Sequence, residues 1–146
     1  MSKQGWRLRG STVSLGLIAW SLTVAAGCQP PGHALPSLIQ DVTVAEADAL
    51  IKANPGDANF VILDVRTRQE YDGGHLQNAE QLNVESGTFR TDVALLEMSK
   101  TYLVYCRTAR RSGNATTIMD ELGFEKLYDM QGGITAWQAA GLPVVQ

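Results

Sequence analysis

The chain has 146 residues, and its 12 Lys and Arg side chains stand against 15 Asp and Glu, a formal net charge of −3. This length suits one folded domain, and the acidic balance argues against a nucleic-acid-binding protein. Two cysteines and two histidines are too few for a disulfide framework, and they give no reason to expect a bound metal ion.

The first 27 residues have the pattern of an export signal. A basic start precedes an apolar stretch at residues 13–26 that is short for a bilayer span, and small residues come before Cys28. The Ala-Gly-Cys ending resembles the lipobox of bacterial lipoproteins, whose cysteine carries the lipid. We therefore expect a lipoprotein-type signal peptide at residues 1–27, lipidation of Cys28, and an exported protein anchored to a bacterial membrane in the periplasm or elsewhere in the cell envelope. An ordinary cleaved signal or an uncleaved anchor is the alternative.

A short tether is predicted between this signal and the folded domain. Residues 28–40 contain a run of Pro and Gly without apolar periodicity, which predicts a flexible segment, and residues 41–146 then form the domain. Loss of the signal peptide removes three basic residues, so nine basic residues face fifteen acidic ones and the net charge becomes −6. No nucleic-acid partner is expected for such a domain.

The domain opens with two helix-start signals around a buried strand. The segment "TVAE" at residues 43–46 has the spacing of a capping box and predicts a helix that ends at "NPG". The continuous apolar run "FVILDV" at residues 60–65 predicts a strand covered on both faces. A second capping box, "TRQE" at residues 67–70, predicts a short helix that ends at Gly73-Gly74.

Strands and helices continue to alternate along the rest of the chain. A weak strand at residues 79–84 precedes a helix with Phe89, Val93 and Leu96, and the strand "TYLVY" precedes a helix that ends at Gly123. The strand "KLYDM" and a helix over residues 134–140 complete the pattern. This order predicts an α/β fold with a mostly parallel central sheet between two layers of helices. Such sheets bind ligands at the carboxyl ends of their strands.

Cys106 stands at one of those ends, followed by three arginines. A chain that passes from a strand into a helix within six residues turns its amide groups inward, and such a nest binds an anion at the positive end of the helix. The same groups, with the arginines, favour a thiolate at Cys106. The alternative is that Cys106 is a buried small apolar residue and the arginines form a solvated helix start.

Four segments of the domain resemble single-domain rhodaneses, a family of sulfurtransferases. They are "ILDVRTRQEYDGGHL" at 62–76, "YLVYCRTARRS" at 102–112, "LGFEKLYDMQGGITAW" at 122–137 and "AGLPV" at 140–144. The resemblance covers nearly all of residues 42–145, and it implies a rhodanese-like three-layer fold without a cofactor.

The resemblance also implies a reaction. Cys106 would take a sulfane sulfur from a small anionic donor, thiosulfate or a persulfide, and would pass it from a Cys106 persulfide to a thiol or to cyanide. The loop amides and Arg111 would hold the charged end of the donor, and Asp64 and Arg66 would support the loops around the site. The substrate-binding loop would comprise Arg107, Thr108, Ala109, Arg110, Arg111 and Ser112.

Two other activities remain open at this point. The loop could bind sulfur compounds or anions without turnover. A phosphatase built on a similar fold is less favoured. Such enzymes have five residues between the catalytic Cys and the Arg, whereas only four residues lie between Cys106 and Arg111.

Several further residues carry narrower predictions. Ala109 stands where single-domain rhodaneses often have Gly, so a positive φ there would strain the loop by ~1 kcal/mol. Asn78 departs similarly from the family pattern in the turn after "GH". His75 is expected to be a structural hydrogen-bonding residue rather than a catalytic base. Gly132-Gly133 is a helix entry that could approach the loop closely, and the alternative is that the two glycines serve only the backbone of their turn.

Overall fold

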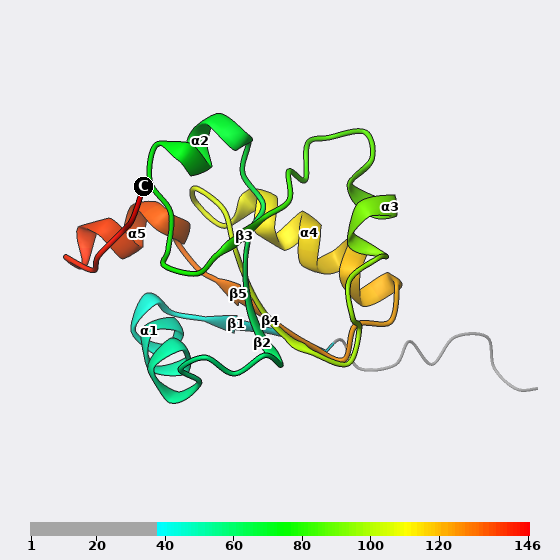
Figure 1. Ribbon diagram of the computed structural model, residues 1–146, viewed down its shortest axis with the longest axis horizontal. Helices are drawn as coiled ribbons and strands as arrows, with labels where there is room; N and C mark the ends of the chain where they lie inside the picture. Colours follow the sequence, from blue (N-terminus) through cyan, green and yellow to red (C-terminus); the bar gives the residue numbers. More distant parts are fainter. Residues whose placement is uncertain (1–37) are drawn as a thin grey trace, which may run out of the picture. The chain divides into compact units, whose positions relative to one another are not determined.

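The computed structural model describes residues 38–146; the predictions for the signal peptide, Cys28 and most of the tether lie outside the described residues. Within this part of the chain, five parallel strands form one sheet in the order β1-β5-β4-β2-β3 (Figure 1). The strands are β1 (Ile39–Val42), β2 (Phe60–Asp64), β3 (Glu80–Gln81), β4 (Thr101–Tyr105) and β5 (Lys126–Met130). The carboxyl ends of β2, β4 and β5 therefore meet at one edge.

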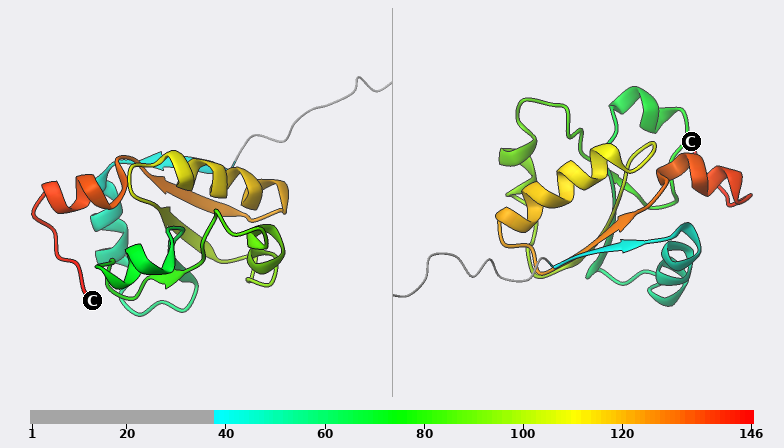
Figure 2. Two further views of the ribbon diagram at one scale, coloured as in Figure 1. Left: turned by 90° about the horizontal axis from the view of Figure 1, so that it is seen from above. Right: turned by 180° about the vertical axis from the view of Figure 1, so that it is seen from behind.

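Helices cover both faces of this sheet, as the views in Figures 1 and 2 show. The helices are α1 (Val44–Ala53), α2 (Arg68–Asp72), α3 (Phe89–Val93), α4 (Arg110–Glu121) and α5 (Gly133–Ala139). Two apolar cores result, one beneath α3 and α4 and the other beneath α1 and α5. The predicted three-layer α/β fold is confirmed, with a sheet that is parallel throughout its described strands. No helix within residues 38–146 is long and apolar enough to cross a membrane.

Strand β1 was not predicted, and it begins inside the segment assigned to the tether. The prediction of a flexible tether is therefore wrong for residues 39 and 40. Only Val42 of this strand is buried, so the sequence shows no apolar run. Its backbone is ordered by pairing with β5, where Ile39 lies opposite Leu127, and this partner is distant in the sequence.

Two other elements are shorter than the sequence suggests. The edge strand predicted at residues 79–84 is reduced to β3, although the amides of Leu82 and Val84 still donate to the carbonyls of Asp64 and Val65. Helix α3 ends at Val93, one turn before the end expected from Leu96. Its apolar side chains nevertheless pack as expected, with Phe89 and Val93 both buried in the core beneath α4.

Both capping boxes form as predicted. The Thr43 hydroxyl accepts from the amide of Glu46, and the Glu46 carboxylate accepts from the amide of Thr43. Thr67 and Glu70 make the same reciprocal pair at the start of α2. Local side-chain bonds of this kind satisfy amides that the first turn of a helix leaves unpaired, so they fix where each helix begins.

Candidate active site

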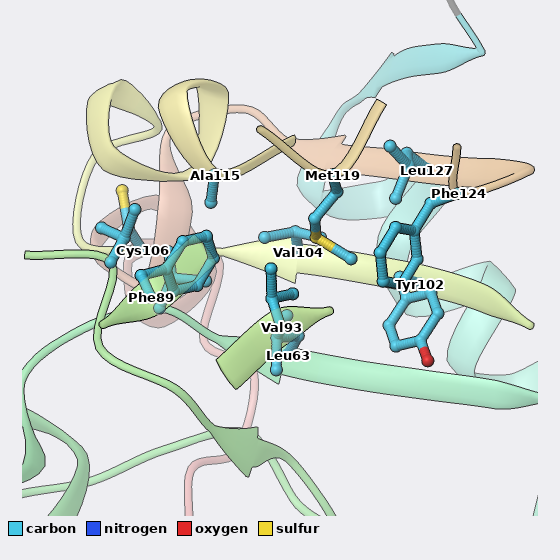
Figure 3. Close-up of a cluster of buried hydrophobic side chains, with 12 residues drawn as sticks. Leu63, Phe89, Val93, Tyr102, Val104, Cys106, Ala115, Met119, Phe124 and Leu127 are labelled. Carbon is cyan, nitrogen blue, oxygen red and sulfur yellow. The ribbon is translucent and has the colours of Figure 1, made fainter. Parts of the chain in front are cut away.

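Cys106 follows the last residue of β4 and is only 1% exposed. Its side chain lies in the core beside Phe89 and Ala115, and its sulfur points toward the turn that leads into α4 (Figure 3). The Ser112 hydroxyl lies 3.6 Å from this sulfur. Cys106 is a free, buried thiol, and the loop at residues 107–112 follows it directly in the chain.

The backbone of that loop leaves a row of unpaired donors. In the part of the chain that the structure describes, the amides of residues 107–112 have no backbone or side-chain acceptor, and the first paired amide of α4 is that of Gly113, which donates to the Ala109 carbonyl at 2.9 Å. No side chain caps this end of the helix. Six consecutive N–H groups at the positive end of a 12-residue helix are thus available to an anion, as the sequence predicts.

Ala109 turns the loop into α4 with a left-handed backbone, at φ +81°. The condition stated for strain is therefore met, and an alanine in this region carries the strain that a glycine would avoid. Asn78, the other departure from the family pattern, also has a positive φ, of +62°. Asn tolerates this conformation better than most residues, so the turn after His75 keeps its shape.

The start of α5 supports the base of the loop. The amide of Ile134 donates to the Cys106 carbonyl at 2.9 Å, and that of Thr135 donates to the Arg107 carbonyl at 3.2 Å. Gly133 has a φ of +56°, and a Cβ atom there would lie 2.6 Å from the carbonyl carbon and oxygen of Arg107. The close approach expected of the Gly132-Gly133 pair is therefore present, and only glycine fits at Gly133.

Arg111 is engaged by two carboxylates rather than turned toward the loop. Its guanidinium group bonds to both oxygens of Glu70, at 2.7 and 2.8 Å, and to Glu85 at 2.9 Å. The Arg111 hydrogen bond is the main cause that lowers the pKa of Glu70 to about 2, against an ordinary value of 4.5. Arg111 thus links α4 to α2 in this structure, and the role implied for it in holding the donor stays a prediction.

The remaining loop side chains face outward. Arg107, Thr108 and Arg110 are exposed, and neither arginine forms an ion pair with any described residue. Arg107 also borders an open pocket of about 460 Å³ between α2 and α5. Two exposed cations without an ion-pair partner among the described residues therefore remain at this loop, where they raise the local concentration of anions.

Asp64 and Arg66 form a buried ion pair at the end of β2. The Arg66 guanidinium bonds to Asp64 at 2.6 Å and to the Gly74 carbonyl at 2.8 Å. The Arg66 carbonyl accepts from Gln81 at 2.7 Å. These bonds tie the end of β2 to the turn at Gly74 and to β3, which is the supporting position expected of the pair, and neither residue bonds to the loop at 107–112.

His75 lies apart from the thiol. Its backbone pairs with Val145, its ring stacks on Tyr71 at 3.7 Å, and its Nδ1 lies 3.0 Å from the Tyr71 carbonyl. Among the described residues, no group of three or more His, Cys, Asp or Glu side chains is placed to hold a metal ion.

Two acidic contributions to the site were missed at the level of sequence. The capping-box spacing of residues 67–70 accounts for Glu70 as a helix cap, and nothing in that spacing indicates Arg111 as a second partner. Asp129, which is 4% exposed near the end of β5, lies beneath the first turn of α4. The sequence signal for Asp129 is a carboxylate inside the otherwise apolar end of the predicted strand "KLYDM", a position that is usually buried.

The chain has clear relatives. The sequence model of the family described as "Rhodanese-like domain" matches residues 43–140. The solved structure of a rhodanese-related protein from Thermoplasma volcanium superposes with a TM-score of 0.62 at 29% identity, over 73% of this chain and 97% of that one. An uncharacterised protein of Synechocystis sp. is 34% identical over 88 residues, and a tRNA uridine(34) hydroxylase of Cronobacter sakazakii is 30% identical over 131. These matches cover 59% and 83% of this chain but 47% and 36% of the two relatives, so the chain spans less than half the length of either.

Proposed function

This chain belongs to the rhodanese-like domain family, and from that premise we propose that it is a sulfurtransferase that works through a persulfide on Cys106. The donor is a small anion with a terminal sulfane sulfur, such as thiosulfate or a persulfide. The acceptor is a thiol or cyanide. The observation that carries this proposal is the row of six unpaired amides that follows a free thiol at the start of α4.

The unpaired amides of residues 107–112 suit a reaction in which the thiolate, the donor and the leaving group are all negatively charged. The Cys106 thiolate attacks the outer sulfur of thiosulfate, a new S–S bond forms, and the bond to the sulfonate sulfur breaks. Sulfite leaves with the electron pair of that bond. The amides of residues 107–112 stabilise negative charge on the thiolate, on the donor and on the departing sulfite, since all three occupy the positive end of α4.

The second half of the cycle needs no further reactant. An acceptor thiolate or cyanide attacks the outer sulfur of the persulfide, and the Cys106 S–S bond breaks with return of its electron pair to Cys106. The product is a new persulfide or thiocyanate. Cys106 is 1% exposed, which favours a small transferable sulfur atom over a bulky group.

Side chains of the loop have separate roles in this proposal. Arg107 and Arg110 attract the anionic donor from solvent, because both are exposed and without an ion-pair partner among the described residues. Ser112 approaches the sulfur directly. Arg111 keeps the first turn of α4 in place through Glu70 and Glu85.

A phosphatase is disfavoured by loop length, because four residues lie between Cys106 and Arg111 where such enzymes have five. A binding module without turnover remains the alternative that an experiment must separate.

The test is a single-turnover measurement on the purified protein. Incubation with thiosulfate should add the mass of one sulfur atom to the peptide that contains Cys106 and release sulfite, and later cyanide should remove that sulfur as thiocyanate. Cys106→Ser should abolish both steps and keep the thermal midpoint. If no sulfane donor changes the mass while thiosulfate still raises the thermal midpoint, the protein is a binding module. Hydrolysis of an aryl phosphate that depends on Cys106 would instead indicate a phosphatase.

We further propose, from the sequence alone, that this activity lies in the bacterial cell envelope on a membrane anchor at Cys28. The basic start, the apolar stretch and the Ala-Gly-Cys ending support this location. Cells that express the full chain should incorporate labelled palmitate into it, and Cys28→Ser should remove the label. Label that persists in the Cys28→Ser variant would contradict the anchor.

A further inference from the structure

The open pocket that Arg107 borders between α2 and α5 has no role in the reaction described so far. Its volume is about 460 Å³, a size typical of sites for small molecules. Its wall includes Ile134 and Thr135, whose amides donate to the Cys106 and Arg107 carbonyls at 2.9 and 3.2 Å. A molecule in this pocket therefore lies beside the start of the active-site loop.

The polar side chains of this pocket have unused hydrogen-bonding groups. Gln69 of α2 and Thr135 and Gln138 of α5 line it, and all three residues are exposed. Within residues 38–146, none of these three side chains has a hydrogen-bond partner. A carboxamide group both donates and accepts hydrogen bonds, and so does a hydroxyl group. Together they suit a ligand that carries a peptide bond.

Arg107 supplies the uncompensated charge of the pocket. The other charged residues in its wall are Arg66 and Glu70. Arg66 is paired with Asp64 at 2.6 Å, and Glu70 is paired with Arg111 at 2.7 Å. Arg107 is exposed and has no ion-pair partner among the described residues. The pocket therefore favours an anionic ligand, and a guanidinium group matches the two oxygens of a carboxylate.

We propose that this pocket binds the sulfur acceptor, and that Arg107 selects a small thiol with a carboxylate and a peptide bond, as in a cysteine derivative. This assignment rests on the sulfurtransferase function proposed above. The acceptor carboxylate pairs with Arg107, and its amide bonds to Gln69 and Gln138. Its thiolate attacks the outer sulfur of the Cys106 persulfide, a new S–S bond forms, and the electron pair of the broken bond returns to Cys106. The donor is held separately, by the loop amides.

The experiment measures the discharge of sulfur from protein that was first loaded with thiosulfate and then freed of excess donor. N-acetylcysteine and N-acetylcysteamine are compared as acceptors, since both carry a thiol and an amide and only the first carries a carboxylate. The ratio of their rates is the carboxylate preference. Arg107→Ala should lower this preference about fivefold, because it removes an ion pair at an open site. Arg107→Glu should lower it further, since like charges repel.

Arg110→Ala is the matched control. Arg110 is an exposed arginine of the same loop, it has no ion-pair partner in the part of the chain that the structure describes, and it lies outside the wall of the pocket. Both alanine variants should slow loading by thiosulfate to a similar extent, and only Arg107→Ala should change the carboxylate preference. A preference that stays the same in Arg107→Ala and Arg107→Glu overturns the proposal, as does an equal loss in Arg110→Ala.

Gln138→Ala tests the contact with the peptide bond. Both thiols carry the amide and cyanide does not, so the rate with either thiol, relative to the rate with cyanide, should fall about threefold through the loss of one neutral hydrogen bond. A fall with N-acetylcysteine alone would contradict the contact assigned to Gln138.

A binding measurement separates this proposal from the function on which it rests, because it needs no sulfur transfer. N-acetyl-S-methylcysteine keeps the amide and the carboxylate but has no free thiol. In an NMR titration of the wild-type protein it should shift the side-chain amide signals of Gln69 and Gln138, and Arg107→Ala should weaken binding about fivefold. These shifts in a protein that never takes up sulfur would support the pocket and refute the sulfurtransferase. Normal sulfur transfer without them would support the sulfurtransferase and overturn the pocket.

Discussion

The two capping boxes of this domain have the same local structure and different tertiary roles. At the start of α1, Thr43 and Glu46 exchange hydrogen bonds of 2.8 and 3.3 Å, and at the start of α2, Thr67 and Glu70 exchange bonds of 3.2 and 3.3 Å. Glu46 has no ion-pair partner among the described residues and is exposed, whereas Glu70 also binds Arg111 of the active-site helix. The Thr-x-x-Glu spacing thus determines the cap alone, and the packing of α2 beside α4 adds the second role.

The pKa values of the two acids reflect this difference. The Thr43 amide is the main cause that lowers the pKa of Glu46, a purely local effect. For Glu70 the main cause is a side chain 41 residues away, and the pKa falls to about 2. One glutamate therefore reports helix capping, and the other reports whether the loop that follows Cys106 is in place.

The largest predicted effect comes from Glu70→Ala. The change removes a cap and a two-oxygen partner of Arg111, so we expect a loss of about 2 kcal/mol, or about 10 °C in thermal midpoint, after allowance for partial exposure. Loading of Cys106 by thiosulfate should slow about tenfold, because the first turn of α4 loses its support. Glu85→Ala removes the more exposed partner of Arg111 and is the matched control, with a smaller effect on both measurements. Equal effects would show that Glu70 acts only as a surface charge.

Thermal midpoints measured at decreasing pH should distinguish Glu70, which is paired with Arg111, from Glu46, which only caps its helix. Because the pKa of Glu70 is lowered from 4.5 to about 2 in the fold, its charge stabilises the protein above pH 4.5, and this contribution is lost as the pH falls toward about 2. The difference in thermal midpoint between wild type and Glu70→Gln should therefore be constant near neutral pH. It should shrink toward zero as the pH falls from 4.5 to about 2. Glu46→Gln should give a smaller difference at neutral pH. A Glu70→Gln difference that persists at pH 2 would contradict the assignment.

Glu46→Ala tests the cap without a tertiary partner. We expect a lower thermal midpoint, with a shift well below that of Glu70→Ala, because only the first turn of α1 loses its side-chain acceptor. Loading of Cys106 should be unchanged, since α1 lies against the opposite face of the sheet from α4. A slower loading rate in this variant would mean that the two capping boxes are not functionally distinct.

The smallest expected effect is that of Ala109→Gly, which probes the backbone strain that the Arg111–Glu70 ion pair helps to hold in place. Gly adopts φ +81° without steric cost, so relief of strain of about 1 kcal/mol is partly offset by the greater freedom of glycine in the unfolded chain. We expect a gain of a few degrees at most in thermal midpoint, in the wild type and equally in the Glu46→Ala background. In Glu70→Ala the same change should also recover part of the lost loading rate. A lower midpoint in the wild-type background would show that Ala109 is not strained.

Much of the fold was predictable because its signals are local. Both capping boxes and the buried strands β2 and β4 follow from residues that lie next to one another in the sequence. The strand β1 was missed for the opposite reason, since its residues form a strand only by pairing with β5. The shortened β3 has the same origin, because an edge strand extends only as far as β2 lies beside it.

The sequence by itself determined the chemistry of the loop. A thiol at the end of an apolar strand, followed within six residues by a helix, requires unpaired amides beside that thiol, whatever surrounds them. Only the tertiary structure decided what the charged residues do there. Arg111 bonds to Glu70 and Glu85, while Arg107 stays in solvent. Asp129 lies beneath Gly113 because β5 passes under α4. Long flexible side chains find their partners through packing between segments far apart in sequence, and no local pattern encodes that choice.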